Sequence, residues 1–276
     1  MRGELGRAGV WSMELRNAGR PEVRDAVAEL DELGWGSIWL PGLDGAGVLD
    51  DVGHVLDATR TATVVTGVLN IWGRSPADLA AGPRTVLGLG IGSPAGAAAH
   101  GQRYGNPVES MSRYLDGLGV PVERRLLGAL GPRMVDLAVA RTSGWHPFLV
   151  TPDYVAEERA RVGDAPVIAP HQTVVLETDP VVAREAARNA VGIFLGFPTY
   201  RANLRRLGFT DADLGPGGSD RLIDALVAHG TADDIARRVH DHLDAGADHV
   251  AVHVVTPAGS PALPLAQWRE LAFLTQ

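Results

Sequence analysis

The chain is 276 residues long and 45% apolar, which suits one large folded domain and excludes a disordered chain. Its net charge of −8 argues against nucleic acid or an anionic membrane as the main partner. Because it has no cysteine, disulfides, thiolate catalysis and cysteine-bound metals are excluded. The sequence has neither a signal-peptide core nor 18 consecutive apolar residues, so we expect a cytoplasmic protein without a transmembrane helix.

The first half of the chain alternates apolar runs with stretches of helical spacing. Pro21 begins an amphipathic stretch that ends before Gly34, an arrangement typical of a capped helix. The run 62–72, ATVVTGVLNIW, is almost continuously apolar, as a parallel strand covered on both faces should be. The sequence predicts strands at 9–15, 36–41, 62–72 and 84–94, helices at 21–33, 50–58, 76–81 and 107–118, and an irregular loop at 95–105.

The second half continues the same alternation. About 70 residues separate the last two predicted strands, which leaves room for a helical insertion. The sequence predicts strands at 123–130, 144–150, 166–177 and 249–255, and helical segments at 133–141, 152–162, 179–207, 220–229, 231–245 and 265–274.

Eight strands that alternate with helices predict a parallel sheet with right-handed crossovers. Eight repeats in one domain favour closure into a (β/α)8 TIM barrel over an open doubly wound sheet. We therefore expect a single α/β barrel domain over residues 1–276, with a helical insertion between strands seven and eight. Chemistry in such a barrel sits at the C-terminal strand ends. These ends are apolar, aromatic and rich in glycine, which suits a flat conjugated cofactor better than a hydrolytic metal centre.

Glycines interrupt two of the predicted strands. The stretch 84–94, RTVLGLGIGSP, changes from an apolar run into alternating glycines. Such glycines let a ligand approach the backbone or mark a tight strand-to-loop transition, and the stretch alone leaves both open. Its spacing does not match the dinucleotide-binding pattern G-x-G-x-x-G. Gly67 lies inside a strand and indicates a bulge, a close ligand approach or close packing within the barrel.

Two later strand ends carry groups that bind anions or transfer protons. The segment 129–132, ALGP, joins a strand to a helix whose N-terminus is suited to phosphate, although a Gly-Pro pair also starts helices that bind nothing. His146 and His171 are candidate proton donors, or hydrogen-bonded structural residues. We expect no metal site, because His240 and His242 diverge on their helix. No serine has the G-x-S-x-G setting of a hydrolase.

Seven segments spread over nearly the whole chain carry a resemblance to a known family. They are LGRAGVW (5–11), AELDELGWGSIWLP (28–41), TGVLNIW (66–72), LGLGIGSP (87–94), LGALGPRMVDLA (127–138), HPFLVTPDY (146–154) and GSDRLIDALVAHG (218–230). In this order they resemble the bacterial luciferase-like monooxygenase superfamily, and most nearly its actinobacterial branch of coenzyme F-420 (deazaflavin)-dependent oxidoreductases. The resemblance implies a (β/α)8 barrel that binds FMN or the deazaflavin at its C-terminal mouth.

The resemblance also implies which residues hold the cofactor. The third-strand bulge of the family, often a non-prolyl cis peptide behind the cofactor ring, matches Gly67 and Val68. The fifth-strand loop, which contacts the side chain and phosphate of the cofactor, matches residues 129–131. The full implied set is Gly67, Val68, Asn70, Gly92, Ser93, Ala129, Leu130, Gly131 and Trp145, and His146 lines the same pocket. Apart from the resemblance, we expect His146 or His171 to act as the catalytic proton-transfer residue.

The chain departs from that family around the mouth. The helix after strand three is cut to 76–81, and Gly42 stands where the branch tends to have an acidic residue. Pro94 follows Ser93 where a histidine is expected, and His171 replaces a glutamate. These departures make a non-catalytic barrel, one that has lost cofactor binding, a stronger alternative for this chain than for a typical member of the family.

We expect an enzyme that transfers a hydride between coenzyme F-420 and a small organic substrate, without metal. The nearest alternative is an FMN-dependent monooxygenase that uses a partner reductase and oxygen. The non-catalytic barrel is the second alternative. The sequence leaves the oligomeric state open, although a homodimer would be in keeping with the superfamily, in which dimers are common.

Overall fold

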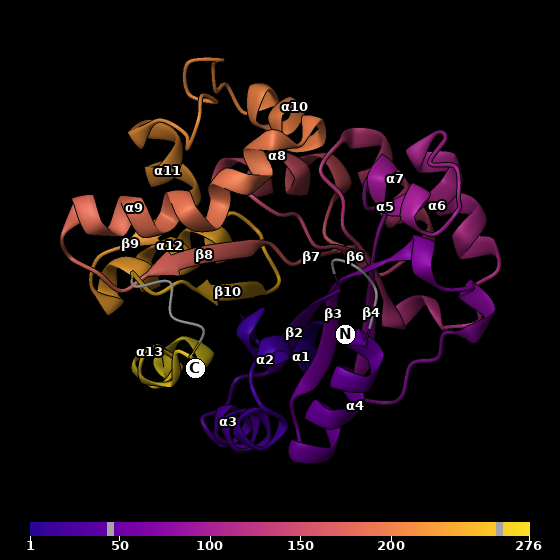
Figure 1. The fold of residues 1–276 in the computed structure, drawn as a ribbon, viewed down its shortest axis with the longest axis horizontal. Helices are drawn as coiled ribbons and strands as arrows, with labels where there is room; N and C mark the ends of the chain where they lie inside the picture. Colours follow the sequence, from indigo (N-terminus) through magenta and orange to yellow (C-terminus); the bar gives the residue numbers. More distant parts are fainter. Residues whose placement is uncertain (43–46, 258–261) are drawn as a thin grey trace.

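The computed structural model describes residues 1–42, 47–257 and 262–276 (Figure 1). The strands are β1 (Ala8–Trp11), β2 (Ser37–Gly42), β3 (Thr63–Asn70), β4 (Thr85–Gly90), β5 (Arg125–Leu127), β6 (Gly144–Trp145), β7 (Val167–Ile168), β8 (His171–Val175), β9 (Val227–His229) and β10 (Val250–Val254). All the described pairings are parallel, in the order β7-β6-β5-β4-β3-β2-β1-β10-β8-β9.

The ring of strands closes through one segment. β7 pairs with β6, and β8 pairs with β10, while only two residues separate β7 from β8. Within this gap, the Ala169 N–H donates to the Trp145 carbonyl at 3.0 Å, and the Ala251 N–H donates to the Pro170 carbonyl at 2.9 Å. The segment therefore joins β6 along its first half and β10 along its second half, which confirms the TIM-barrel-like α/β fold. β9 lies outside the ring, on β8.

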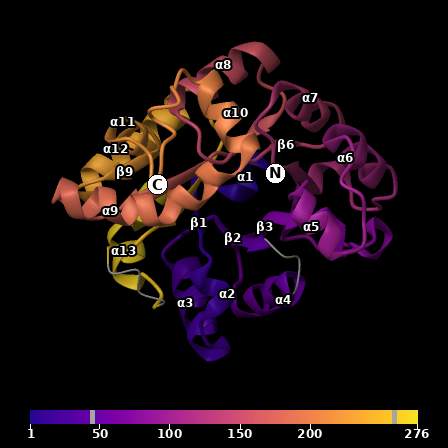
Figure 2. The same cartoon turned by 45° about the horizontal axis from the view of Figure 1, so that its top comes forward.

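Helices form the outer layer, and Figure 2 shows them placed around the strands. The α-helices are α1 (Arg2–Leu5), α2 (Glu14–Asn17), α3 (Arg20–Glu32), α4 (Val48–Ala58), α5 (Pro94–Ala99), α6 (Pro107–Asp116), α7 (Pro132–Arg141), α8 (Pro152–Val162), α9 (Pro180–Val191), α10 (Pro198–Arg206), α11 (Asp220–Leu226), α12 (Ala232–Asp244) and α13 (Leu265–Glu270). The 3-10 helices are η1 (Ile71–Gly73), η2 (Pro76–Asp78), η3 (Val122–Arg124), η4 (Gly192–Gly196) and η5 (Ala272–Thr275).

Strand alternation divides the apolar residues between two places. Alternate residues of each strand point outward into the layer between barrel and helices, and the others point inward. The inward cluster consists of Leu5, Trp11, Trp39, Val65, Val86, Leu126, Val167, Ala169 and Ala251. The barrel is therefore a packed core, in which Trp11 stands at the C-terminal end of β1 and Trp39 lies within β2.

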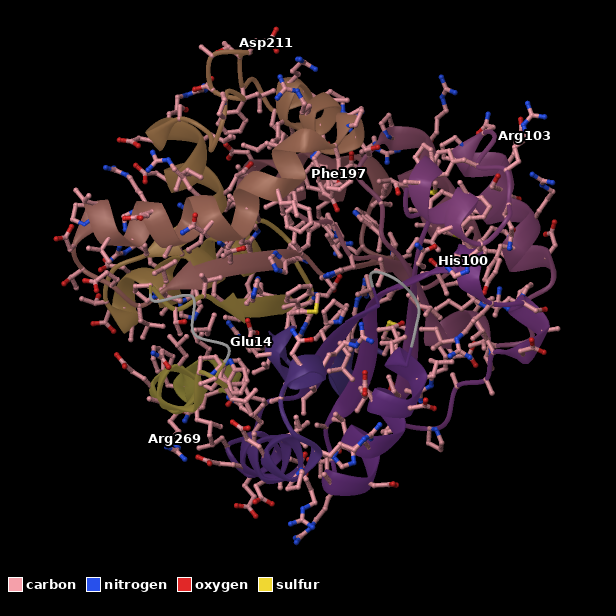
Figure 3. All side chains as sticks on the ribbon, in the orientation of Figure 1. Glu14, His100, Arg103, Phe197, Asp211 and Arg269 are labelled. Atoms are coloured by element: carbon pink, nitrogen blue, oxygen red, sulfur yellow. The ribbon has the colours of Figure 1, made fainter. Side chains whose placement is uncertain are left out.

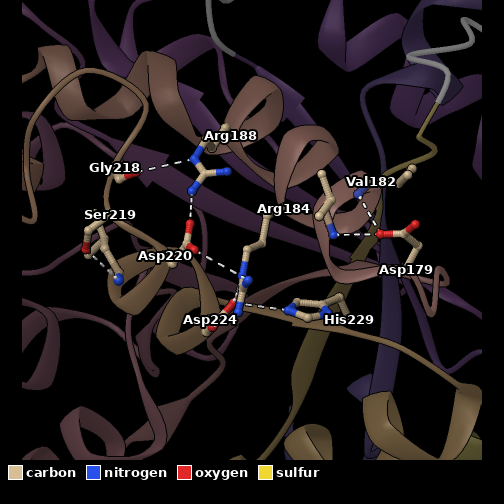
Figure 4. Close-up of polar contacts among 11 residues, drawn as sticks. Asp179, Val182, Arg184, Arg188, Gly218, Ser219, Asp220, Asp224 and His229 are labelled. Atoms are coloured by element: carbon tan, nitrogen blue, oxygen red, sulfur yellow. Dashed lines mark hydrogen bonds and ion pairs between the residues drawn. The ribbon is translucent and has the colours of Figure 1, made fainter.

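The insertion between β8 and β10 comprises α9, η4, α10, α11, β9 and α12, and most of it packs around a core of its own. Figure 4 shows the polar contacts that join α9 to α11. Arg184 pairs with Asp224 through two bonds of 2.9 and 2.7 Å, and His229 lies 3.1 Å from the same carboxylate. Arg188 pairs with Asp220 one turn away. The insertion is thus a folded unit attached to the barrel wall, rather than a loose loop.

The sequence-based prediction was wrong for three connections. The helix expected at 220–229 ends at Leu226, because Val227, Ala228 and His229 pair with β8 as β9. The loop expected at 95–105 contains α5, since Ser93 caps its N-terminus by accepting a bond from the Gly96 N–H at 3.1 Å. The helix expected at 76–81 is only the 3-10 turn η2.

The long helical region expected at 179–207 is interrupted by η4, and β1 ends at Trp11 because Glu14–Asn17 forms α2. Among the described helices, none combines the length and the apolar character that crossing a membrane requires.

Candidate active site at the barrel mouth

The end of β3 is irregular at Gly67 and Val68. The peptide bond between them is cis, and the pairing with β4 shifts between Val65 and Leu69. The bulge and the cis bond that the family resemblance implied are therefore both present. Gly67 itself lies against the interior aromatic rings, because a Cβ there would lie 3.0 Å from Trp11 Nε1.

Glycines of the neighbouring strands make room for the Val68 side chain. A Cβ on Gly90 would lie 2.4 Å from Val68 Cγ2, and a Cβ on Gly128 would lie 3.3 Å from the same atom. A Cβ on Gly88 would lie 2.2 Å from the Thr66 carbonyl oxygen. Gly88 and Gly90 thus leave room for the Thr66 backbone and the Val68 side chain, both of the neighbouring strand β3. Val68 remains partly exposed, so it forms an apolar platform at the C-terminal end of the barrel.

Asn70 lies between the ends of β3 and β4. Its Oδ1 accepts a bond from the Trp72 N–H at 3.0 Å, and a Cβ on Gly92 would lie 2.7 Å from its Nδ2. Gly92 has a φ of 60°, a conformation that favours glycine. Gly92 is exposed and Ser93 is partly exposed. Asn70 and Gly92 therefore lie together at the C-terminal ends of β3 and β4, and Ser93 follows directly.

The loop after β5 leads into the N-terminus of α7. Ala129 and Leu130 are buried among the outer apolar residues, and Gly131 is an N-cap without a side-chain bond. Arg206 of α10 donates from Nη2 to the Leu130 carbonyl at 3.2 Å. A Cβ on Gly131 would lie 3.5 Å from Arg206 Nη1. A guanidinium beside an uncapped helix N-terminus is a favourable place for an anion.

Trp145 shares the outer apolar layer with Ala129 and Leu130, and its side chain does not line the barrel mouth. It belongs to the apolar layer outside the barrel, fully buried, and its Nε1 donates to the Tyr154 hydroxyl at 3.3 Å. The strand alternation explains this, because Leu127, its register partner on β5, also points outward.

His146 is the next residue along and lies inside the barrel. Its ring stacks on Trp39 at 4.5 Å, and its Nδ1 lies 2.7 Å from the Ala169 carbonyl oxygen. A carbonyl only accepts, so we assign the proton to Nδ1, which leaves a lone pair on Nε2. Nε2 has no partner among the described residues. Burial, opposed by the bond to Ala169, lowers the pKa of His146 to about 4.

His171 lies beside His146, surrounded by rings. The ring centroids of Phe148, Trp11 and His253 lie 3.9, 4.9 and 5.2 Å from its own. Neither ring nitrogen has a partner in the described part of the chain. Burial, with smaller contributions from His253 and His146, lowers the pKa of His171 well below its usual value. The imidazole is therefore neutral at physiological pH.

Trp11 connects the buried histidines to the bulge of β3, and His253 connects them to solvent. Trp11 donates from Nε1 to the Gly67 carbonyl at 2.9 Å, and its ring lies 4.4 Å from that of His253. His253 is partly exposed, and its Nδ1 has no partner within the described residues. Burial lowers the pKa of His253 to about 4, and the charge of Glu14 opposes the shift.

Sequence reasoning gave no site role to Trp11, Phe148 or Arg206, and it named His253 as a strand-end candidate without assigning it a function. Alternation in the run 249–255, HVAVHVV, puts His253 on the same face as the buried Ala251, which was a usable signal. Arg206 had none, because its contact at Leu130 is 76 residues away in the chain. The four described residues His146, His171, His249 and His253 line the interior, but no group of three or more metal-ligating side chains in the described ranges is placed to hold a metal.

No known family profile and no curated protein matches this sequence. Solved structures do match it in fold. The chain is similar to an F-420-dependent secondary alcohol dehydrogenase in complex with an F-420–acetone adduct, with a TM-score of 0.68 and 14% identity over 98% of this chain and 99% of that one. It is similar to the coenzyme F-420-dependent tetrahydromethanopterin reductase from Methanopyrus kandleri, with a TM-score of 0.67 and 17% identity over 97% of both chains.

A third similar structure is the oxygenating constituent of 3,6-diketocamphane monooxygenase from Pseudomonas putida, a type II Baeyer-Villiger monooxygenase in complex with FMN. Its TM-score is 0.64, with 15% identity over 99% of this chain and 97% of that one. These structures belong to the luciferase-like monooxygenase superfamily, and the chain has the fold of that superfamily.

Proposed function

We propose that this chain is an oxidoreductase that binds a flavin-type cofactor at the barrel mouth and transfers a hydride between that cofactor and a small organic substrate. Coenzyme F-420 is the cofactor we favour, and FMN is the alternative. One observation carries the proposal: an apolar platform around Val68 lies at the same barrel end as buried imidazoles whose nitrogens lack partners in the described residues. The fold similarity to F-420- and FMN-dependent enzymes supports it.

The residues present fit such a cofactor. Val68 offers an apolar surface to a flat ring, and the exposed backbone of Gly92 lies beside it. Phosphate fits at Gly131, where the first turn of α7 and Arg206 both provide donors. Asn70 and Ser93 complete the polar rim. We assign no contact to Trp145, which supports the wall from outside.

The protein's own contribution is proton transfer and exclusion of water. A deazaflavin, when bound, supplies a ring carbon that accepts or returns a hydride. Oxidation of an alcohol in this way removes a hydride from carbon and a proton from oxygen, and the Nε2 lone pair of His146 or a nitrogen of His171 can take that proton. Since both imidazoles are neutral at physiological pH, each begins as the base when the alcohol is oxidised and returns the proton as a donor in the reverse reaction.

Equilibrium binding tests the cofactor assignment. Purified protein is titrated with coenzyme F-420 and, separately, with FMN, and binding is followed by fluorescence. We expect binding of F-420 in the micromolar range or tighter, and weaker binding of FMN. FMN binding together with NADH-driven oxygen uptake in the presence of a reductase would favour the monooxygenase instead. Absence of binding by either cofactor would leave the non-catalytic barrel.

Arg206 and Arg205 provide a matched pair for the phosphate site. Arg206→Ala removes the guanidinium beside Gly131, and loss of a charge-assisted hydrogen bond weakens binding by about tenfold or more. Arg205→Ala lies on the same helix but pairs with Asp211 on the exposed surface, so it leaves the dissociation constant unchanged. Equal dissociation constants for both variants would place the phosphate elsewhere.

A further inference from the structure

Phe148 lies directly over His171. It follows β6, and its ring centroid is 3.9 Å from that of His171, with 31° between the ring planes. Phe148 is partly exposed, whereas His171 is only 2% exposed. Of the rings around His171, Trp11 and His146 are themselves buried, so Phe148 and His253 are the ones that separate it from solvent.

Behind Phe148 stand aromatic rings from the insertion. Phe194 of η4 lies 4.7 Å from Phe148, and Tyr200 of α10 lies 6.0 Å from it. Tyr200 in turn lies 6.2 Å from Phe197, which is 41% exposed and is labelled on the insertion in Figure 3. The rings form a continuous apolar path from the surface of the insertion to His171.

The backbone fixes the position of Phe148. The next residue, Leu149, has a φ of 54°, which costs on the order of 1–2 kcal/mol for a residue other than glycine. Leu149 is 2% exposed and packs in the core of the insertion, while Phe148 also contacts the interior cluster of the barrel. This turn therefore buries Leu149 in the core of the insertion and places Phe148 between that core and the barrel interior, and packing on both sides holds the strained conformation.

A phenyl ring leaves the imidazole unsatisfied. Both nitrogens of His171 are buried without a partner in the described residues, and an unsatisfied buried polar group costs on the order of 1–3 kcal/mol. Phe148 offers no hydrogen bond. A molecule that took the place of its ring, and carried a hydroxyl or carbonyl group, would satisfy a nitrogen of His171 and keep the apolar contacts with Phe194.

We propose that Phe148 is the specificity-determining residue of the active site. Its ring occupies the place that the substrate takes on His171, and a substrate reaches the imidazole along the aromatic path by displacing it. The substrate class is a flat, uncharged molecule with one hydroxyl or carbonyl group. Charged molecules are rejected because the rings and neutral imidazoles here offer no compensating charge. The proposal rests on the proposed function for the existence of a substrate, but its test needs no cofactor.

Chemical modification of the histidines measures access to His171. Diethyl pyrocarbonate transfers an ethoxycarbonyl group to a neutral imidazole nitrogen, and peptide mass spectrometry reports the rate at each histidine. Phe148→Ala should raise the rate at His171 by about tenfold or more, and Phe148→Leu should raise it less. His249 is the internal control: it is fully buried and bonded to the Gly6 carbonyl and to Trp39, so only general loosening of the barrel would expose it.

Phe194→Ala distinguishes the effect of the Phe148 ring from the effect of the support behind it. Among the described aromatic rings, Phe194 contacts Phe148 and Tyr200 but not His171. We expect a smaller increase at His171 for Phe194→Ala than for Phe148→Ala. An unchanged rate in Phe148→Ala would overturn the proposal, as would an equal increase in Phe194→Ala. If Phe148→Ala does not fold, the rate in Phe148→Leu decides, because Leu retains most of the volume.

A binding measurement tests the substrate class directly. Benzyl alcohol and benzoate differ mainly in charge, and each is tested for protection of His171 from modification in the wild-type protein. Protection by benzyl alcohol alone supports the proposal. Protection by benzoate, or by neither, contradicts the stated class. These results stand whether or not coenzyme F-420 binds, so they are distinguishable from failure of the proposed function.

Discussion

At the scale of single residues, burial keeps the interior histidines neutral. The sequence predicted His146 and His171 as proton-transfer residues, and both rings lie inside the barrel, where desolvation disfavours the imidazolium form. His249 shows what a satisfied interior histidine looks like. Its Nδ1 lies 2.9 Å from the Gly6 carbonyl oxygen, and its Nε2 accepts from Trp39 at 3.0 Å. The unpartnered nitrogens of His146 and His171 differ from this pattern, which marks them as functional candidates.

The neutral His249 makes stability depend on pH. Burial, opposed by the bond to Gly6, lowers its pKa to about 4, below the unfolded value of 6.5. The unfolded chain therefore binds more protons between these values, so the stabilisation is complete above pH 6.5 and is lost as the pH falls toward 4. We expect His249→Gln, whose amide can replace both bonds, to reduce the loss of unfolding free energy between pH 7 and pH 5 by about 2 kcal/mol.

Urea unfolding at the two pH values checks this expectation. Between pH 7.5 and pH 8.5, where the imidazole is neutral in both states, the wild-type protein and His249→Gln should respond equally to pH. An equal loss between pH 7 and pH 5 would show that His249 does not titrate as its burial requires.

At the scale of elements, the positions of the strands could be predicted from the sequence, whereas the contacts made at their glycines could not. The apolar runs and helical spacing indicated the barrel strands, because burial on both faces leaves a clear pattern. The glycines of β4 stayed ambiguous, since their neighbours belong to other strands. Gly88 and Gly90 turn out to accommodate the backbone at Thr66 and the side chain of Val68. Short elements such as η2 and β9 depend on tertiary pairing, which local sequence does not encode.

Gly90→Ala tests this contact between β3 and β4. The added Cβ would lie 2.4 Å from Val68 Cγ2, so Val68 must move, and overpacking of this kind destabilises by about 1–3 kcal/mol. Gly53→Ala is the control, because Gly53 lies within α4 and nothing stands within 4 Å of the new Cβ. Alanine there should stabilise by about 0.5–1 kcal/mol, since it favours helix. Thermal unfolding of both variants measures the difference, and equal melting temperatures would refute the Val68 contact.

At the scale of the whole molecule, the barrel brings together residues that are distant in the chain. The expected barrel and the placement of the mouth followed from counting strands, because parallel strands in a closed ring present all their C-terminal ends on one face. The place of the insertion in the chain was predicted, but its packing against the barrel could not be predicted in this way. Phe194 meets Phe148, and Arg206 meets Leu130, only because the insertion folds back onto the barrel wall.

The same long-range folding separates residues that the sequence grouped. Trp145 and His146 are neighbours in the chain, but the first supports the wall and the second faces the interior. A resemblance that covers both residues cannot distinguish these roles, whereas the alternation of β6 does.

A crystal structure of the protein grown with coenzyme F-420 tests the central claim most directly. The account predicts the deazaflavin ring against Val68, beside Gly92 and Ser93, with its phosphate near Gly131 and Arg206. A cofactor bound away from the barrel mouth, or absent from crystals grown at saturating concentration, would contradict it.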